Sequence, residues 1–108
     1  MAINLIQLLI TLQTGFNNDL VIIKVNGEEV FNKKGITSSQ LPTGEQSFAL
    51  DLPEGLTVVN VSVPTRNLAD TKSYEIANNK FLGISIVKPE ISPSGIRFIL
   101  RDKTFYSF

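Results

Sequence analysis

Side chains able to bind or to do chemistry gather in two polar segments of this 108-residue chain. They are Asn17, Asn18 and Asp19 in the first segment and Arg66, Asn67 and Asp70 in the second. Amide, carboxylate and guanidinium groups present donors and acceptors at fixed angles, which suits recognition of sugar hydroxyls or of a peptide backbone. Asn and Asp are also frequent turn formers, so a simpler explanation is two solvated turns, with a surface ion pair between Arg66 and Asp70. We predict that these six residues form a ligand-binding surface on loops 15–19 and 64–72.

Oxygen-rich loops also raise the question of a calcium site, because Ca²⁺ takes only oxygen ligands. Such a site would need the segment 17–19 and the pair Asn67 and Asp70 to share one end of the domain. The chain has no EF-hand spacing and no repeated Asp-x-Asp pattern. The sequence therefore predicts no metal or cofactor, and calcium is left as an unsupported alternative.

Catalysis finds little support in the residue types. The chain has no histidine and no cysteine, which excludes Ser-His and Cys-His nucleophilic sites and the commonest transition-metal ligands. The adjacent carboxylates Glu28 and Glu29 lie in a predicted strand, where neighbouring side chains point to opposite faces. We expect a protein that is not an enzyme.

Three aromatic residues stand at the C-terminus: Phe105, Tyr106 and Phe108. Chain ends usually fray, so aromatic side chains there favour either a docked edge strand or strand addition to a second chain. Docking within the domain is the simpler explanation, but these residues are also candidate self-association contacts, and we expect a homo-oligomer.

Charge and composition narrow the partners. Ten basic and ten acidic residues give a net charge of zero, whereas a nucleic-acid binder usually shows a basic excess. The apolar start, residues 1–12, is too short to span a bilayer and lacks the basic region of a signal peptide. We therefore expect no nucleic-acid partner and no membrane insertion. The lack of cysteine leaves the compartment open and slightly favours the cytoplasm.

The elements that must position these groups are predicted to be strands. Apolar and polar residues alternate with period two, and turn residues recur every 8–12 positions, a pattern typical of β-sandwiches. The expected strands are 3–14, 20–25, 28–32, 46–52, 56–63, 72–77, 81–88 and 96–101. The first of these also fits a helical stripe. We predict an all-β fold, a single antiparallel β-sandwich of about seven to eight strands, jelly-roll or immunoglobulin-like, as one domain over residues 1–108.

Two turns are specific enough to predict pairing. Asn26-Gly27 favours a two-residue type I′ hairpin that places Lys24 opposite Glu29, Ile23 opposite Val30 and Ile22 opposite Phe31. This run resembles hairpins of carbohydrate-binding jelly rolls and other bacterial β-sandwich modules, and the resemblance covers one hairpin only.

The second specific turn is Pro53-Glu54-Gly55, which fits a three-residue hairpin loop joining the strands on either side. Taken together, the sequence favours a non-enzymatic interaction module that binds a protein or a glycan through its loops. The alternative is a structural subunit that assembles through strand edges and the aromatic C-terminus.

Overall fold

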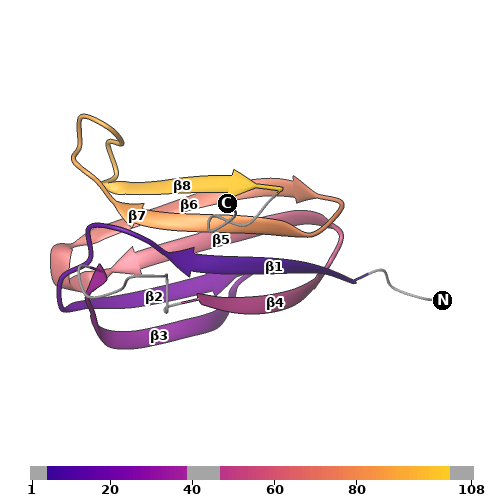
Figure 1. Ribbon diagram of the computed structural model, residues 1–108, viewed down its shortest axis with the longest axis horizontal. Helices are drawn as coiled ribbons and strands as arrows, with labels where there is room; N and C mark the ends of the chain where they lie inside the picture. Colours follow the sequence, from indigo (N-terminus) through magenta and orange to yellow (C-terminus); the bar gives the residue numbers. More distant parts are fainter. Residues whose placement is uncertain (1–4, 39–46, 103–108) are drawn as a thin grey trace, which may run out of the picture.

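The chain forms a sandwich of two four-stranded β-sheets, as the computed structural model shows for residues 5–38 and 47–102 (Figure 1). The prediction of an all-β sandwich is confirmed. The strands are β1 (Leu5–Leu12), β2 (Asp19–Val25), β3 (Glu28–Ile36), β4 (Ser47–Pro53), β5 (Gly55–Val63), β6 (Leu68–Ile76), β7 (Lys80–Ile86) and β8 (Ile96–Arg101). One 3₁₀ turn, η2 (Pro64–Arg66), lies between β5 and β6. In the described ranges no helix is long and apolar enough to cross a membrane.

The two sheets have the strand orders β4-β1-β7-β8 and β3-β2-β5-β6. Neighbouring strands pair in an antiparallel manner except for β1 and β7, which run parallel. The chain crosses from one sheet to the other after β1, β3, β4 and β6. The first segment is therefore a central strand, as the period-two prediction had it, and not a helix.

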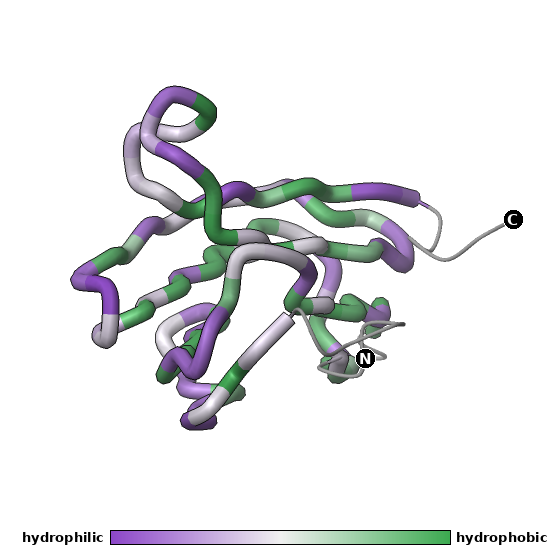
Figure 2. The backbone as a smooth tube through the Cα atoms, turned by 60° about the vertical axis from the view of Figure 1, so that its left-hand side comes forward, coloured by the Kyte–Doolittle hydropathy of each residue, from purple (hydrophilic) through white to green (hydrophobic). Residues whose placement is uncertain are grey.

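The core lies between the sheets and is made of the inward side chains of central strands. Every second residue is fully buried from Leu8 to Leu12 in β1 and from Thr57 to Val63 in β5, because side chains alternate between the two faces of a strand. Figure 2 shows the result as hydrophobic stretches that recur along the strands, with more polar connections at their ends. Fully buried apolar residues include Leu8, Ile10, Leu12, Ile23, Val59, Val61, Val63, Leu82 and Ile84.

The Asn26-Gly27 turn forms as predicted, because both residues have positive φ, 53° and 83°. Lys24 lies opposite Glu29, but a register shift between Ile23 and Lys24 then places Ile23 opposite Phe31 and not Val30. The predicted pairing of Ile22 with Phe31 is likewise wrong, since Ile22 lies opposite residue 32. This bulge turns Phe31 inward, where its ring stacks on Phe48 of β4 with centroids 5.1 Å apart.

The segment Pro53-Glu54-Gly55 does not close a hairpin. β4 pairs with β1 in one sheet, while β5 pairs with β2 and β6 in the other. Gly55 has φ 125°, a conformation open mainly to glycine, which lets the chain cross between the layers. The predicted hairpin loop is therefore wrong: Pro53 is the last residue of β4 and Gly55 the first of β5, so only residue 54 lies between two strands of different sheets.

Candidate functional site

Three connections from different parts of the chain meet at one end of the sandwich, the left-hand end in Figure 1. They are the β1–β2 connection with Gly15, the η2 turn with Arg66, and the β7–β8 loop over residues 87–95. We call this region the loop end. Part of the predicted binding surface, loops 15–19 and the start of 64–72, is brought together here.

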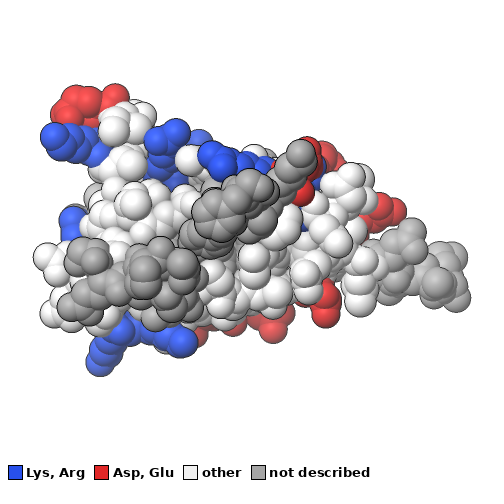
Figure 3. Space-filling view, viewed as in Figure 1, with Lys and Arg blue, Asp and Glu red and all other residues white. Residues whose placement is uncertain are grey.

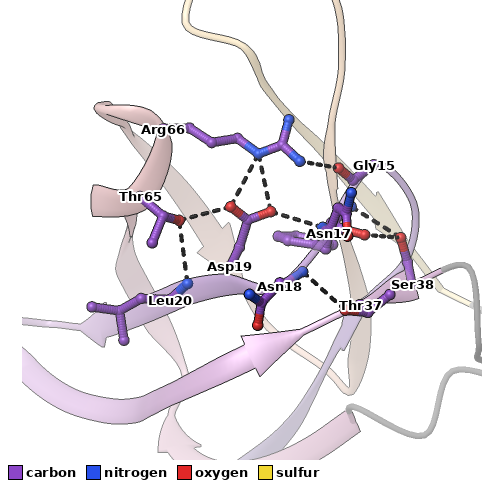
Figure 4. A network of polar contacts seen from close by, with 10 residues as sticks. Gly15, Asn17, Asn18, Asp19, Leu20, Thr37, Ser38, Thr65 and Arg66 are labelled. Carbon is purple, nitrogen blue, oxygen red and sulfur yellow. Dashed lines mark hydrogen bonds and ion pairs between the residues drawn. The ribbon is translucent and has the colours of Figure 1, made fainter.

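The centre of the loop end is an ion pair between Asp19 and Arg66 (Figure 4). The Nε–H of Arg66 lies 3.1 Å from Oδ1 and 3.0 Å from Oδ2 of Asp19. The Thr65 hydroxyl donates to Oδ1 at 2.7 Å, and the backbone N–H of Asn17 donates to Oδ2 at 2.8 Å. The Asp19 side chain is only 3% exposed, against 36% for Arg66. A buried carboxylate is thus satisfied by donors from two connections.

These contacts change the acidity of Asp19. Burial of the carboxyl by itself raises its pKa, but hydrogen bonds from Asn17, Thr65 and Arg66, with the positive charge of Arg66, outweigh burial. The pKa of Asp19 is therefore lowered from its usual value of 3.8. The Asp19 side chain is therefore an anion at neutral pH. Its charge is balanced within the protein by that of Arg66, so Asp19 holds Arg66 in place.

Gly15 fixes the β1–β2 connection against β7. Its φ is 90°, and a Cβ at this position would lie 2.2 Å from the carbonyl oxygen of Ile86. Only glycine satisfies both demands. The Gly15 carbonyl in turn accepts a 3.0 Å hydrogen bond from Nη2 of Arg66. The guanidinium group is therefore held at two of its nitrogens.

The end of β3 closes the other side of the β1–β2 connection. The backbone N–H and C=O of Phe16 both bond to the Ser38 hydroxyl, at 2.9 and 3.2 Å. Asn18, with φ 53°, donates its backbone N–H to the Thr37 hydroxyl at 2.9 Å. Asn17 and Asn18 therefore act first as turn residues, and their side chains are exposed.

Two open depressions lie on either side of Gly15. The larger, which we call the Arg66 cleft, has a volume of about 490 Å³. Its lining residues are Gly15, Arg66, Ile86, Val87, Lys88 and Ile91. The smaller, of about 400 Å³, is lined by Thr14, Gly15, Phe16, Asn17 and Ser38. The Arg66 cleft combines aliphatic walls with two cationic side chains.

The charge distribution agrees with this composition. In Figure 3 the basic side chains lie along the upper edge and at the lower left, while acidic atoms lie along the lower edge, to the right and at the upper left. The β7–β8 loop also carries one acidic residue, Glu90. Glu90 does not line the Arg66 cleft.

The second predicted segment is only partly at this site. Asn67 has φ 57° and ends η2 by donating its backbone N–H to the Pro64 carbonyl, so it is a turn former. Asp70 lies in β6, not in a loop, because β6 begins at residue 68. The predicted Arg66–Asp70 ion pair is wrong: Arg66 pairs with Asp19, and Asp70 accepts a 2.7 Å hydrogen bond from the Ser94 hydroxyl.

A calcium site would need oxygen-rich loops at one end of the domain and oxygen atoms that are free to bind the ion. The structure meets the first condition and not the second. The loops bearing Asp19 and Arg66 do share one end, yet the oxygens of Asp19 already accept from Asn17, Thr65 and Arg66. Within residues 5–38 and 47–102, no three acidic side chains gather that could hold a metal ion. The candidate self-association residues Phe105, Tyr106 and Phe108 lie outside the described residues.

Sequence reasoning missed most of the lining of the Arg66 cleft. The sequence places Ile86, Val87 and Lys88 at the end of the predicted strand 81–88 and Ile91 between the predicted strands, and it indicates no binding role for them. The signal available in the sequence was an aliphatic residue, Ile91, between two prolines at positions 89 and 93, and the structure shows that it is exposed. An exposed aliphatic side chain in a proline-restricted loop is a candidate contact.

Comparison with known proteins identifies no relative. No protein family matches the chain, and no match was found among curated proteins or solved structures. The function therefore has to be argued from the loop end itself.

Proposed function

We propose that this protein is a non-enzymatic interaction module that binds a protein partner through the loop end. The observation that carries the proposal is the Arg66 cleft, an open depression of about 490 Å³ with aliphatic walls and two cations. Binding sites are commonly built on connections that a rigid sandwich holds in place. Here Asp19 and Gly15 hold the connections to one another.

A recognition role fits the chemistry of the site better than catalysis. The oxygens of the buried Asp19 carboxylate accept hydrogen bonds from three donors within the protein, so no lone pair is directed at a substrate. The chain also has no histidine or cysteine to act as base or nucleophile. The polar side chains that line the cleft, Arg66 and Lys88, are donors.

The lining favours a protein over a glycan. Sugar hydroxyls need both donors and acceptors, and those buried against Ile86, Val87 and Ile91 would lack partners. An apolar side chain of a protein would cover the same surface favourably. The glycan alternative remains a distinct outcome of the experiment.

The test is a selection of peptide ligands from a random display library on the immobilised full chain, followed by measurement of Kd by fluorescence anisotropy. We expect Ile91→Ser to weaken the selected ligand at least about fivefold, since an exposed anchor at the cleft is removed. Leu56→Ser is the matched control, because Leu56 and Ile91 are both 61% exposed and Leu56 lies on β5, outside the cleft lining. The control is expected to keep the wild-type Kd.

Two results would contradict the proposal. Ligands that lose affinity equally with Leu56→Ser and Ile91→Ser would place binding away from the cleft. Binding on a glycan array that Ile91→Ser abolishes, with no peptide selected, would instead favour the glycan alternative.

A further inference from the structure

We infer that the Arg66 cleft recognises a peptide segment of a partner protein in which an aliphatic side chain stands next to a carboxylate. This inference rests on the proposed function and assigns the chemistry of its ligand. It follows from how Arg66 is held, from the charges at the cleft, and from the shape of the lining.

Arg66 is a preorganised donor. A guanidinium group carries five N–H donors, and two of these are used within the described residues, the Nε–H by Asp19 and one Nη2–H by Gly15. N–H groups on both Nη atoms are left over, and no described residue accepts from them. Because the plane of the group is already fixed, a carboxylate can bind to it at a smaller entropic cost than to a mobile arginine.

The charges at the cleft complement an anion. The charge of Arg66 is balanced by that of Asp19, which is 3% exposed and lies behind it. Lys88, on the β7–β8 side, then adds a positive charge that no acidic residue of the lining offsets. A ligand carboxylate between Arg66 and Lys88 would meet donors from both sides.

The aliphatic part of the cleft sets the second requirement. Ile86 and Val87 form half-buried walls, and Ile91 stands at the rim with 61% of its surface exposed. An apolar side chain of the ligand would remove these surfaces from water. Bare phosphate or nucleic acid would leave them uncovered, and neither is favoured by a chain of zero net charge.

The open shape favours a peptide over a small molecule. Small-molecule sites enclose most of the ligand surface, whereas the Arg66 cleft is bounded on one side by the exposed Ile91. A segment of a partner protein can fill such a cleft with one side chain and continue across the neighbouring surface at Asn17 and Ser38, on the far side of Gly15.

The experiment compares two synthetic peptides, acetyl-Gly-Leu-Asp-Leu-Gly-amide and the same peptide with Asn in place of Asp. Kd is measured by titrating the backbone amide signals of the ¹⁵N-labelled full chain. We expect saturable shifts at residues 15–17, 66, 86–88, 90 and 91 with the Asp peptide, and a Kd at least about fivefold weaker with the Asn peptide. The free acid isocaproate, which offers the same two groups without a peptide backbone, is expected to bind more weakly still.

Variants of the chain separate the two cations from the rest of the molecule. Lys88→Gln is expected to reduce the preference for Asp over Asn, and Arg66→Lys to reduce it further, since lysine lacks the planar fork. Lys24→Gln makes the same change of charge on the β2–β3 hairpin, at the far end of the sandwich, and is expected to keep the preference. If Arg66→Lys does not fold, Lys88→Gln still decides. The turn after β7 uses the Lys88 carbonyl, which accepts hydrogen bonds from the backbone N–H groups of residues 91 and 92, and this carbonyl is unchanged in Lys88→Gln.

The outcomes of the peptide titrations separate a failure of this inference from a failure of the proposed function. Equal affinities of the Asp and Asn peptides at the cleft would overturn the carboxylate requirement and leave the proposed function standing. Shifts confined to the strand faces, or no shifts with either peptide, would overturn the inference, and the display selection would then decide the proposed function. Isocaproate binding as tightly as the Asp peptide would indicate a small-molecule site instead.

Discussion

At the scale of single residues, Asp19 is the group on which the loop end depends. Its carboxylate joins the start of β2 to η2, although Asp19 and Arg66 are 47 positions apart in the chain. Removal of such a carboxylate leaves three donors without an acceptor in a largely buried place. The cost of unmade buried hydrogen bonds exceeds the gain from making an exposed one.

We therefore expect Asp19→Ala to lower the free energy of unfolding by about 2–3 kcal/mol. The measurement is urea denaturation at pH 7. Glu75→Ala, which removes an exposed carboxylate on β6, is the control and is expected to change stability by less than about 0.5 kcal/mol. Equal effects of the two substitutions would mean that the Asp19 network contributes nothing.

The lowered pKa of Asp19 predicts a pH dependence. Because the folded pKa lies below the unfolded value, the ionised carboxylate stabilises the fold above about pH 4, and this contribution is lost as pH falls through the folded pKa. The stability difference between wild type and Asp19→Asn should be constant from about pH 5 to 8 and shrink below about pH 4. A difference that persists unchanged at pH 2 would contradict the assigned ionisation.

A substitution at Thr57 is expected to raise the free energy of unfolding, not to lower it. Its hydroxyl is fully buried in β5 and has no hydrogen-bond partner in the described part of the chain. Thr57→Val keeps the shape and removes the unsatisfied group, so we expect a gain of about 1 kcal/mol. Thr11→Val is the matched control: Thr11 is equally buried but accepts a hydrogen bond from Ser47, so this change should destabilise. Thermal unfolding of both variants measures the difference.

At the scale of elements, the connection between β1 and β2 decides whether the loop end forms. Gly15 is pressed against the Ile86 carbonyl, and the parallel ladder of β1 and β7 continues into this connection through the bond from the Ile86 N–H to the Thr14 carbonyl. The connection and β7 therefore move together, and with them one wall of the Arg66 cleft.

Gly15→Ala is expected to cost more than about 2 kcal/mol and to weaken the cleft ligand. The substitution adds a steric clash with Ile86 to the strain of a positive φ. Gly27→Ala isolates the strain, because Gly27 has a similar φ of 83° but open space around its Cβ position, and it should cost only about 1 kcal/mol. Chemical denaturation compares them, and equal losses would show that close packing at Gly15 is unimportant.

Local sequence patterns predicted the strands. They did not predict contacts between residues that are distant in the sequence. The alternation of Val59, Val61 and Val63 and the Asn26-Gly27 turn depend on neighbouring residues, so the sequence sufficed for them. Whether the strands flanking residues 53–55 pair with one another is not a local property, because the same turn residues suit a hairpin and a crossing between sheets. The predicted ion pair of Arg66 with Asp70 is wrong for the same reason, because the actual partner, Asp19, is distant in the sequence.

At the scale of the whole molecule, ten basic and ten acidic residues balance one another, and Arg66 and Lys88 are the charged residues that line the Arg66 cleft. Two strands at sheet edges carry charged side chains that discourage edge-to-edge pairing: Lys33 and Lys34 in β3, and Asp70, Lys72 and Glu75 in β6. Self-association through strand edges stays the alternative prediction for the function.

The two functions differ in the mass of the particle in solution. For an interaction module we expect sedimentation as a monomer of 11.9 kDa at concentrations up to about 100 µM. Analytical ultracentrifugation at several concentrations is the measurement. A stable dimer or larger assembly would favour the structural subunit.

Hydrogen–deuterium exchange of the full chain, with and without the tightest ligand from the display selection, tests the binding role of the loop end most directly. Added protection is expected at residues 14–17, 65–66, 86–88, 90 and 91, with little change in β3 to β5. Protection confined to the outer faces of the sheets or to the strand edges would contradict a binding site at the loop end.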